Sequence, residues 1–117
     1  MPELESKIEN YKSDYDFENG RQNDLTPNVN NTVLQFKEIF ESRNIIVKGG
    51  SKLFRAKFTI EGTAIVKDQL YYIDSGHKGY AAEIEIFDKS SKKHFGAMTL
   101  EAKYKPNSRV PGRFITP

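Results

Sequence analysis

The spacing of apolar residues changes near residue 44, and this change constrains the fold more than any other feature of the sequence. Before it, apolar side chains recur at intervals of three and four residues, at Val33, Phe36, Ile39 and Phe40. Asn31 precedes them and is suited to cap a helix. These intervals predict an amphipathic helix over about residues 31–43. After residue 44 the apolar residues alternate with polar ones, which is the pattern of β-strands.

Turn-forming residues divide this alternating part of the chain into short segments. Strands are expected over residues 45–47, 53–60, 63–66, 69–73, 81–87 and 93–100. Residues 105–117 contain three prolines and a glycine and are expected to be mostly loop. The expected fold class is α+β, with an N-terminal helix or helices packed on a twisted antiparallel β-sheet of five to six strands.

One of these strands has two chemically different faces. Ile84 and Ile86 lie on one face, whereas Glu83, Glu85 and Phe87 lie on the other. One face therefore builds core and the other presents carboxylates. An isolated glutamate in such a strand faces solvent by default. Two neighbouring acids on one face also point the same way, so they do not flank a substrate as the two acids of a glycosidase do.

Length and composition indicate one small domain with a modest core. The chain has 117 residues, of which 37% are hydrophobic and 29% charged. No apolar run is long enough to span a membrane, and no signal-peptide pattern is visible. The absence of cysteine excludes disulfides and thiolate ligands. Residues 1–30 form a polar acidic segment, read as a short helix with Leu4, Ile8, Tyr11 and Tyr15 on one face or as the remnant of a linker, and residues 31–117 form the main domain.

Charge is unevenly distributed along the chain. The net charge is only +2, but seven basic residues within residues 89–117 face a single acid, Glu101. Such a basic C-terminal part suggests an anionic partner, although a solvated lysine-rich surface gives the same pattern. The run Lys103-Tyr104-Lys105 suits stacking of RNA bases between cations, and it equally suits an edge strand protected by lysines.

Both histidines of the chain lie within ten residues of the strand that carries the two glutamates. His77 follows Asp74 in an Asp-Ser-Gly-His run. An aspartate can hold a histidine ring in the tautomer that acid–base catalysis needs, although the same run also forms a simple Asx turn. His77 and His94 lack the spacing of common metal sites, and no phosphate-binding glycine loop or serine nucleophile motif is present. The residues therefore favour metal-free acid–base cleavage of RNA as the function to test.

The order and spacing of these residues resemble a known family. An Asp-Ser-x-His run at Asp74 and His77 is followed by Glu85 in a strand, by His94 nine residues later within Lys-His-Phe-Gly, and by Arg113 nineteen residues after that. An aromatic residue, Tyr71, precedes the aspartate. This pattern resembles the cytotoxic ribonuclease domain of ribosome-inactivating colicins and the related C-terminal domains of contact-dependent inhibition toxins. The resemblance covers about residues 70–115.

The resemblance implies a metal-independent endoribonuclease toxin that needs no cofactor and produces a 2′,3′-cyclic phosphate. Asp74, His77, Glu85 and Arg113 would be the catalytic residues. Glu85, or His77 held by Asp74, would take the 2′-OH proton, a protonated histidine would aid the leaving 5′-oxygen, and Arg113 would stabilise the phosphoryl charge. Glu83 competes with Glu85 for the glutamate role. Substrate contacts are expected from Tyr71, Glu83, Lys93, His94, Lys103, Lys105 and Arg109.

The same resemblance implies partners and a place of action. The expected substrate is ribosomal RNA in the ribosome, and a cognate acidic immunity protein would protect the producing cell. The chain would be delivered as the C-terminal part of a larger secreted or cell-surface toxin and act in the cytoplasm of the target bacterium. Two alternatives stay open. One is a toxin ribonuclease that cuts tRNA anticodon loops, and the other is a non-enzymatic α+β binding module whose basic tail contacts an acidic partner.

Overall fold

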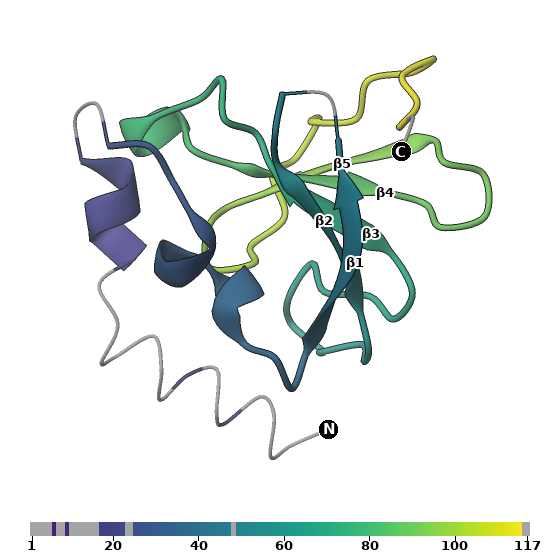
Figure 1. The fold of residues 1–117 in the computed structure, drawn as a ribbon, viewed down its shortest axis with the longest axis horizontal. Helices are drawn as coiled ribbons and strands as arrows, with labels where there is room; N and C mark the ends of the chain where they lie inside the picture. The colour runs from purple at the N-terminus through teal and green to yellow at the C-terminus, as the bar shows by residue number, and fades with distance from the viewer. Residues whose placement is uncertain (1–5, 7–8, 10–16, 23–24, 48, 116–117) are drawn as a thin grey trace.

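The computed structural model describes residues 6, 9, 17–22, 25–47 and 49–115, and the described chain is organised around one five-stranded antiparallel sheet. The strands are β1 (Phe40–Ile46), β2 (Lys52–Ala56), β3 (Leu70–Ile73), β4 (Ile84–Phe87) and β5 (His94–Met98). They lie in the order β1-β2-β3-β4-β5, so each strand pairs with its neighbour in sequence (Figure 1). The predicted antiparallel sheet is confirmed.

The helical content of residues 17–115, where described, is limited to short 3-10 turns. These are η1 (Phe17–Arg21), η2 (Val29–Asn31), η3 (Val33–Gln35) and η4 (Gly79–Ala81). Figure 1 shows the first three gathered on one side of the sheet. The fold is therefore mostly β with minor helical turns. The helix expected around Leu4, Ile8, Tyr11 and Tyr15 lies outside the described residues.

The predicted helix over residues 31–43 is wrong. Thr32, not Asn31, caps a single turn there, with its Oγ1 accepting a hydrogen bond from the Leu34 N–H at 3.2 Å. The chain becomes extended at Phe36 and enters β1 at Phe40. The apolar residues that suggested a helix are all buried in the main core: Val33, Leu34, Phe36, Ile39 and Phe40. Packing against the sheet, rather than a helical repeat, explains their spacing.

The predicted strands are found except one. β3, β4 and β5 lie within the expected segments, β2 overlaps residues 53–60, and β1 extends the segment 45–47 toward the N-terminus. Residues 63–66 instead follow a turn at residues 61–62 as irregular chain, where Thr63 Oγ1 donates to the Ile60 carbonyl at 2.8 Å and accepts from the Ile65 N–H at 3.1 Å. The described residues after 105 are mostly loop, as predicted, apart from an isolated bridge between Lys93 and Phe114.

The sheet has a core on each face. Tyr71, Ile73, Ile84 and Ile86 point into the main core, which the 3-10 turns cover and to which Phe17 also belongs. The opposite face carries a smaller cluster made of Val47, Leu53, Leu70, Phe87 and Ile115. Polar side chains share this second face, because residues that alternate with core residues along β3 and β4 must point there.

A β-bulge in β5 decides which face His94 occupies. Glu85 pairs with Ala97 and Ile86 with Gly96, but Phe87 pairs with His94, so Phe95 is an extra residue in the strand. In a regular strand His94, which is three positions before Ala97, would point to the face opposite Ala97 and Glu85. The bulge brings it to the face of Glu85 instead.

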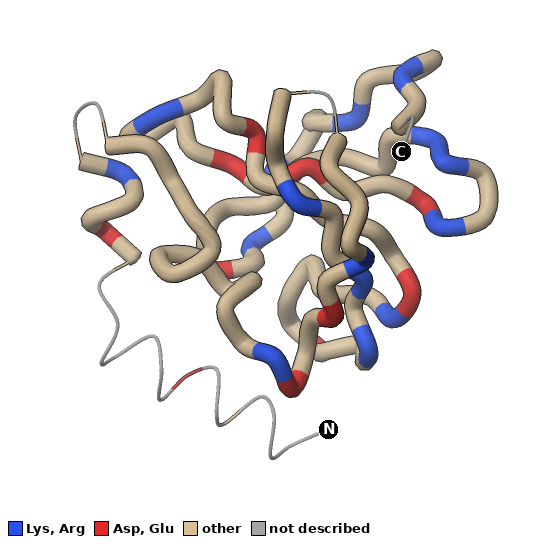
Figure 2. Tube along the Cα trace, viewed as in Figure 1, with Lys and Arg blue, Asp and Glu red and all other residues tan. Residues whose placement is uncertain are grey.

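Charged residues of both signs are distributed along the described trace rather than gathered in one block (Figure 2). No helix within the part of the chain that the structure describes is both long and apolar enough to cross a membrane.

Candidate functional site

Four polar side chains form a row on the second face of the sheet. Tyr72 on β3 pairs with Glu85 on β4. One step further along, the Asp74 N–H donates to the Glu83 carbonyl at 3.2 Å. Since residues opposite each other in an antiparallel pair share a face, Tyr72, Asp74, Glu83 and Glu85 all point the same way.

Glu85 and His94 form the buried end of this row. Nε2 of His94 lies 2.7 Å from Oε1 of Glu85, and the two side chains are only 1% and 3% exposed. The Val110 N–H donates to Nδ1 of His94 at 2.9 Å, so the ring proton lies on Nε2 and is donated to Glu85. Burial, followed by the nearby charge of Arg113, lowers the pKa of His94. His94 is therefore a neutral ring that holds Glu85 in place.

Arg113 connects the C-terminal segment to the same row. Its Nη1 donates to Oε1 of Glu85 at 3.2 Å and its Nη2 to the Tyr72 hydroxyl at 2.7 Å. The guanidinium lies 5.6 Å from the ring centroid of Phe87. The His94 N–H also donates to the Arg113 carbonyl at 2.9 Å, which fixes the backbone beside β5. With 36% of its side chain exposed, Arg113 remains accessible to an anion from solvent.

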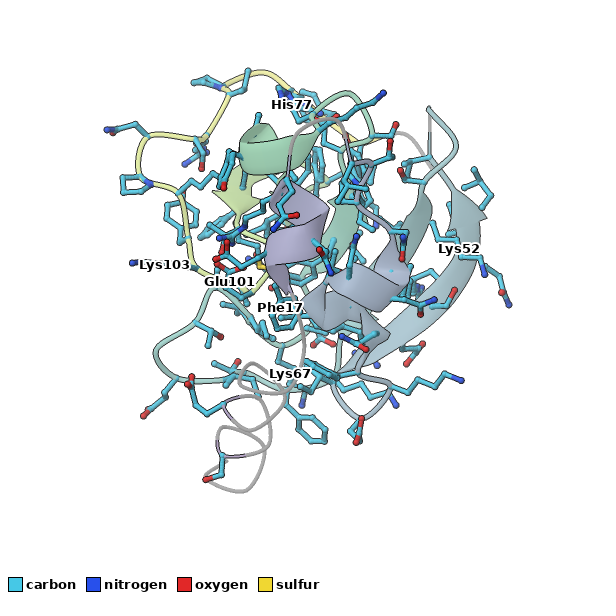
Figure 3. All side chains as sticks on the ribbon, turned by 90° about the vertical axis from the view of Figure 1, so that its left-hand side faces the viewer. Phe17, Lys52, Lys67, His77, Glu101 and Lys103 are labelled. Carbon is cyan, nitrogen blue, oxygen red and sulfur yellow. The ribbon has the colours of Figure 1, made fainter. Side chains whose placement is uncertain are left out.

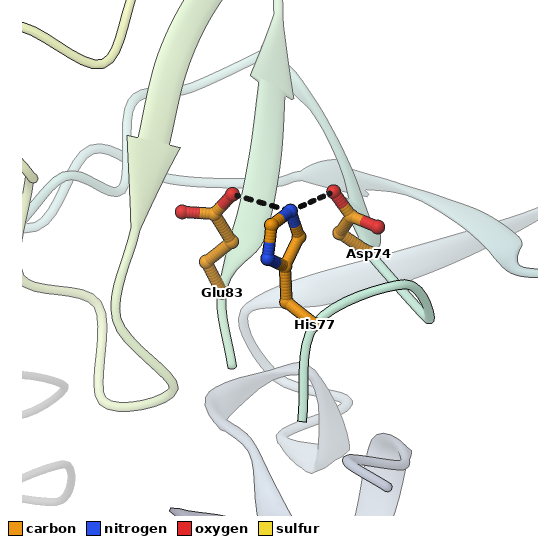
Figure 4. A group of neighbouring side chains, drawn as sticks. All are labelled: Asp74, His77 and Glu83. Atoms are coloured by element: carbon orange, nitrogen blue, oxygen red, sulfur yellow. Dashed lines mark ion pairs between the residues drawn. The ribbon is translucent and has the colours of Figure 1, made fainter. Parts of the chain in front are cut away.

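The accessible end of the row consists of Asp74, His77 and Glu83. Nε2 of His77 lies 3.4 Å from Oδ2 of Asp74 and 3.7 Å from Oε1 of Glu83, so the ring is placed between two carboxylates (Figure 4). The His77 side chain is 49% exposed. On the far side of Glu83, Lys105 Nζ contacts Oε2 at 3.1 Å. This end offers solvent a proton acceptor beside a cation.

Glu83 and Glu85 join the two ends through a hydrogen bond between their carboxyl groups. Burial, reinforced by the neighbouring Glu83, raises the pKa of Glu85 to about 8. Burial also disfavours ionisation of Glu83, but its hydrogen bonds with Glu85 and Lys105 outweigh this and lower its pKa. The pair thus holds one proton near neutral pH, on Glu85, and one negative charge, on Glu83. Two carboxyls in contact commonly divide in this way.

Most of the predicted site residues belong to this row or contact one of its members. Asp74, His77, Glu83, Glu85, His94, Lys105 and Arg113 are linked by the contacts above. Arg109 is exposed, and its charge helps to lower the pKa of His94. The expectation that Glu85 faces solvent is wrong, because Arg113, Tyr72 and the bulged strand cover it.

Two predicted substrate contacts, Tyr71 and His94, are corrected because both side chains are buried. Tyr71 is fully buried in the main core, where its hydroxyl donates to the Ala64 carbonyl and accepts from the Val66 N–H, both at 2.9 Å. His94 is buried with both ring nitrogens occupied. Lys93 and Lys103 are exposed, and their roles as substrate contacts stay predictions.

Sequence reasoning missed Tyr72. The alternation of side chains along the strand could have identified it, because Tyr72 lies on the same face as Asp74, whereas Tyr71 lies on the face of the core residue Ile73.

Comparisons with protein-family models, curated proteins and solved structures found no match to this chain. Its function is therefore inferred from the residues and their geometry.

Proposed function

We propose that this chain is a metal-independent endoribonuclease that cleaves RNA by attack of a 2′-OH on the adjacent phosphate. One observation carries the proposal. Residues as far apart as Tyr72, His77 and Arg113 meet on one sheet face as a connected series of an accessible imidazole, paired carboxylates and a guanidinium. An acid–base group beside a phosphate-binding cation is what this reaction requires, because RNA supplies its own nucleophile.

In the proposed mechanism, Nε2 of His77 takes the proton of the 2′-OH. Asp74 and Glu83 flank the ring at 3.4 and 3.7 Å and stabilise the positive charge that it acquires. Arg113 binds the phosphoryl oxygens, whose negative charge grows in the transition state. Lys105 stabilises the leaving 5′-oxygen, which takes a proton from water, and the hydroxide so formed takes the proton from His77. The products are a 2′,3′-cyclic phosphate and a 5′-OH.

Glu85 acts as a positioning residue in this mechanism. Its side chain is only 3% exposed and is protonated near neutral pH, so it is poorly suited to accept a proton from substrate. Its Oε1 accepts hydrogen bonds from both His94 and Arg113, and this double contact orients the guanidinium. The role given to Glu85 by the family resemblance thus passes to His77.

Exposed aromatic side chains at the edge strand β5 offer a surface for RNA bases. Phe95, the extra residue of the bulge, and Tyr104 are 44% and 38% exposed, with ring centroids 6.2 Å apart. Tyr104 lies between Lys103 and Lys105, and the latter reaches Glu83. Exposed rings beside cations are the usual means of binding unpaired bases.

The family resemblance noted in the sequence also suggests a biological role and a target for this activity. We propose that the chain is the toxin domain of a bacterial competition system, with ribosomal RNA as its target and an acidic immunity protein as its inhibitor. Cleavage of tRNA uses the same chemistry and would be recognised by the size of the products. Gel analysis of total bacterial RNA after brief induction separates the two targets, because fragments of ribosomal RNA and of tRNA form different bands.

The direct test is cleavage of total RNA by the purified chain, with and without EDTA. We expect cleavage in both conditions and products with 5′-OH ends. Loss of cleavage in chelator, with recovery on adding a divalent ion, would reject the metal-independent mechanism. A non-enzymatic binding module predicts neither cleavage nor growth arrest when the chain is expressed in bacteria.

Variants assign the roles. His77→Asn should lower the cleavage rate by about 10²- to 10⁴-fold, the usual contribution of a general base. Glu85→Gln should lower it less than about tenfold, because an amide oxygen still accepts from His94 and Arg113. Lys67→Gln is the matched control, since Figure 3 shows Lys67 far from His77 across the molecule. An equal loss for Glu85→Gln and His77→Asn would assign proton abstraction to Glu85.

A further inference from the structure

The three accessible groups of the row face one another without forming normal hydrogen bonds. Oδ2 of Asp74 and Oε1 of Glu83 lie 3.4 and 3.7 Å from Nε2 of His77, whereas N–H···O hydrogen bonds are typically about 2.7–3.2 Å long. One donor atom from each residue lies within 4.8 Å of the other two. Figure 4 shows the ring nitrogen directed between the two carboxylates.

These separations suit a shared metal ion. Zinc binds imidazole nitrogen and carboxylate oxygen at about 2.0–2.2 Å in a tetrahedral arrangement, which separates neighbouring ligand atoms by roughly 3.3–3.5 Å. An ion placed between the three atoms would replace two long contacts by three short bonds. Small movements of the three side chains are enough to reach this geometry.

The second oxygen of each carboxylate is already bound by another group. Oδ1 of Asp74 accepts the Gly76 N–H at 2.9 Å, and Oε2 of Glu83 contacts Lys105 at 3.1 Å. Both carboxylates are thereby oriented so that their remaining oxygens, Oδ2 and Oε1, face the ring. Outer partners of this kind orient the ligands of metal sites. The cluster therefore differs from a group of acids that merely lie near one another on a surface.

We infer that Asp74, His77 and Glu83 form a binding site for Zn²⁺, with the fourth position open to water. An imidazole and two carboxylates favour such a transition-metal ion over Mg²⁺, which takes oxygen ligands in octahedral geometry. Resting on the proposed function, the inference adds that Zn²⁺ inhibits the ribonuclease, because the metal occupies the Nε2 lone pair that would accept the 2′-OH proton.

The two histidines give the test an internal control. In NMR spectra of the ¹⁵N-labelled full chain, added Zn²⁺ should shift the Nε2 signal of His77 saturably at one ion per chain. The signals of His94 should not move, because both of its ring nitrogens already have partners. No shift at His77, or equal shifts at both rings, would overturn the site.

Substitutions test the ligands separately. Asp74→Asn and Glu83→Gln should each weaken Zn²⁺ binding by at least about tenfold, as measured by calorimetry. Lys105→Gln should weaken it to a smaller extent, because Lys105 holds Oε2 of Glu83 and so orients Oε1 toward the ion. Unchanged affinity in Asp74→Asn and Glu83→Gln chains that remain folded by circular dichroism would contradict the assignment.

Activity measurements separate this inference from the proposed function. Zn²⁺ should stop RNA cleavage and EDTA should restore it, whereas Mg²⁺ at the same concentration should have no such effect. Binding of Zn²⁺ by a chain that cuts no RNA would reject the ribonuclease and leave the metal site standing. RNA cleavage by a chain whose His77 signals ignore Zn²⁺ would reject the metal site and leave the ribonuclease standing.

Discussion

Glu85 is the residue on which the contacts of the site converge. Its carboxyl accepts from His94 and Arg113 and is hydrogen-bonded to Glu83. Burial makes the proton, rather than the charge, the stable state of this group in the folded chain. The uncharged carboxyl group of Glu85 therefore links the neutral ring of His94 to the guanidinium of Arg113, which remains accessible to solvent.

The pKa of Glu85 predicts a pH dependence of stability. Its folded value of about 8 lies above the ordinary 4.5, so its contribution is complete below pH 4.5 and is lost as pH rises toward 8. Glu85→Gln mimics the protonated acid and cannot ionise. In metal-free buffer, its free energy of unfolding should therefore rise relative to wild type between pH 5 and pH 8, by about 1–3 kcal/mol. Urea unfolding at both pH values measures this, and a constant difference would contradict the raised pKa.

Arg113 gives a second prediction at this scale. Its two terminal nitrogens contact Glu85 and Tyr72 separately, a forked geometry that lysine cannot reproduce. Arg113→Lys should keep the fold but lower RNA cleavage by roughly ten- to a thousandfold. Arg109→Lys is the matched control from the same segment and should matter less. Equal losses would mean that the segment supplies only charge.

Two features of the strands place these residues on one face: the alternation of side chains along β3 and β4, and the bulge in β5. Alternation along β3 and β4 sends Tyr72 and Glu85 to one face and Tyr71 and Ile86 to the other. The bulge in β5 adds His94 to the face of Glu85. Gly96, next to the bulge, has φ +148, and a Cβ there would lie 2.4 Å from the Tyr104 hydroxyl.

Gly96→Ala should therefore disturb the bulge. The new methyl group meets Tyr104, and the backbone conformation disfavours a side chain, so we expect destabilisation of about 1–3 kcal/mol and weaker cleavage. Gly62→Ala is the control, because Gly62 also has positive φ but no atom within 4 Å of an added Cβ. Thermal unfolding compares the two, and an equal cost would show that contact with Tyr104 is unimportant.

In the whole molecule, the main hydrophobic core and the proposed site lie on opposite faces of the sheet. The main core lies on one face with the 3-10 turns, and the proposed site lies on the other with a smaller apolar cluster. Phe17 shows that the described part of the N-terminal segment contributes to that core. Substitutions on the core face should change stability with little effect on cleavage.

Tyr71→Phe tests this separation. The substitution removes a buried hydroxyl that serves the Ala64 carbonyl and the Val66 N–H, which costs about 1–3 kcal/mol. Cleavage by the folded variant should remain within about twofold of wild type, measured well below its unfolding temperature. A large loss of activity in a folded Tyr71→Phe chain would restore the substrate role that the sequence suggested.

The sequence by itself determined the antiparallel sheet, most of its strands and the shared face of Glu83 and Glu85, because side-chain alternation is a local property of the chain. Only the tertiary structure decided that residues 31–43 form a turn and a strand, since apolar residues at helical spacing can equally be anchors on a sheet. It also decided the face of His94, the burial of Glu85 and the contact of Arg113 with Tyr72, 41 positions away. These depend on register and on the bulge, which arise from pairing between distant segments and leave little trace in local periodicity.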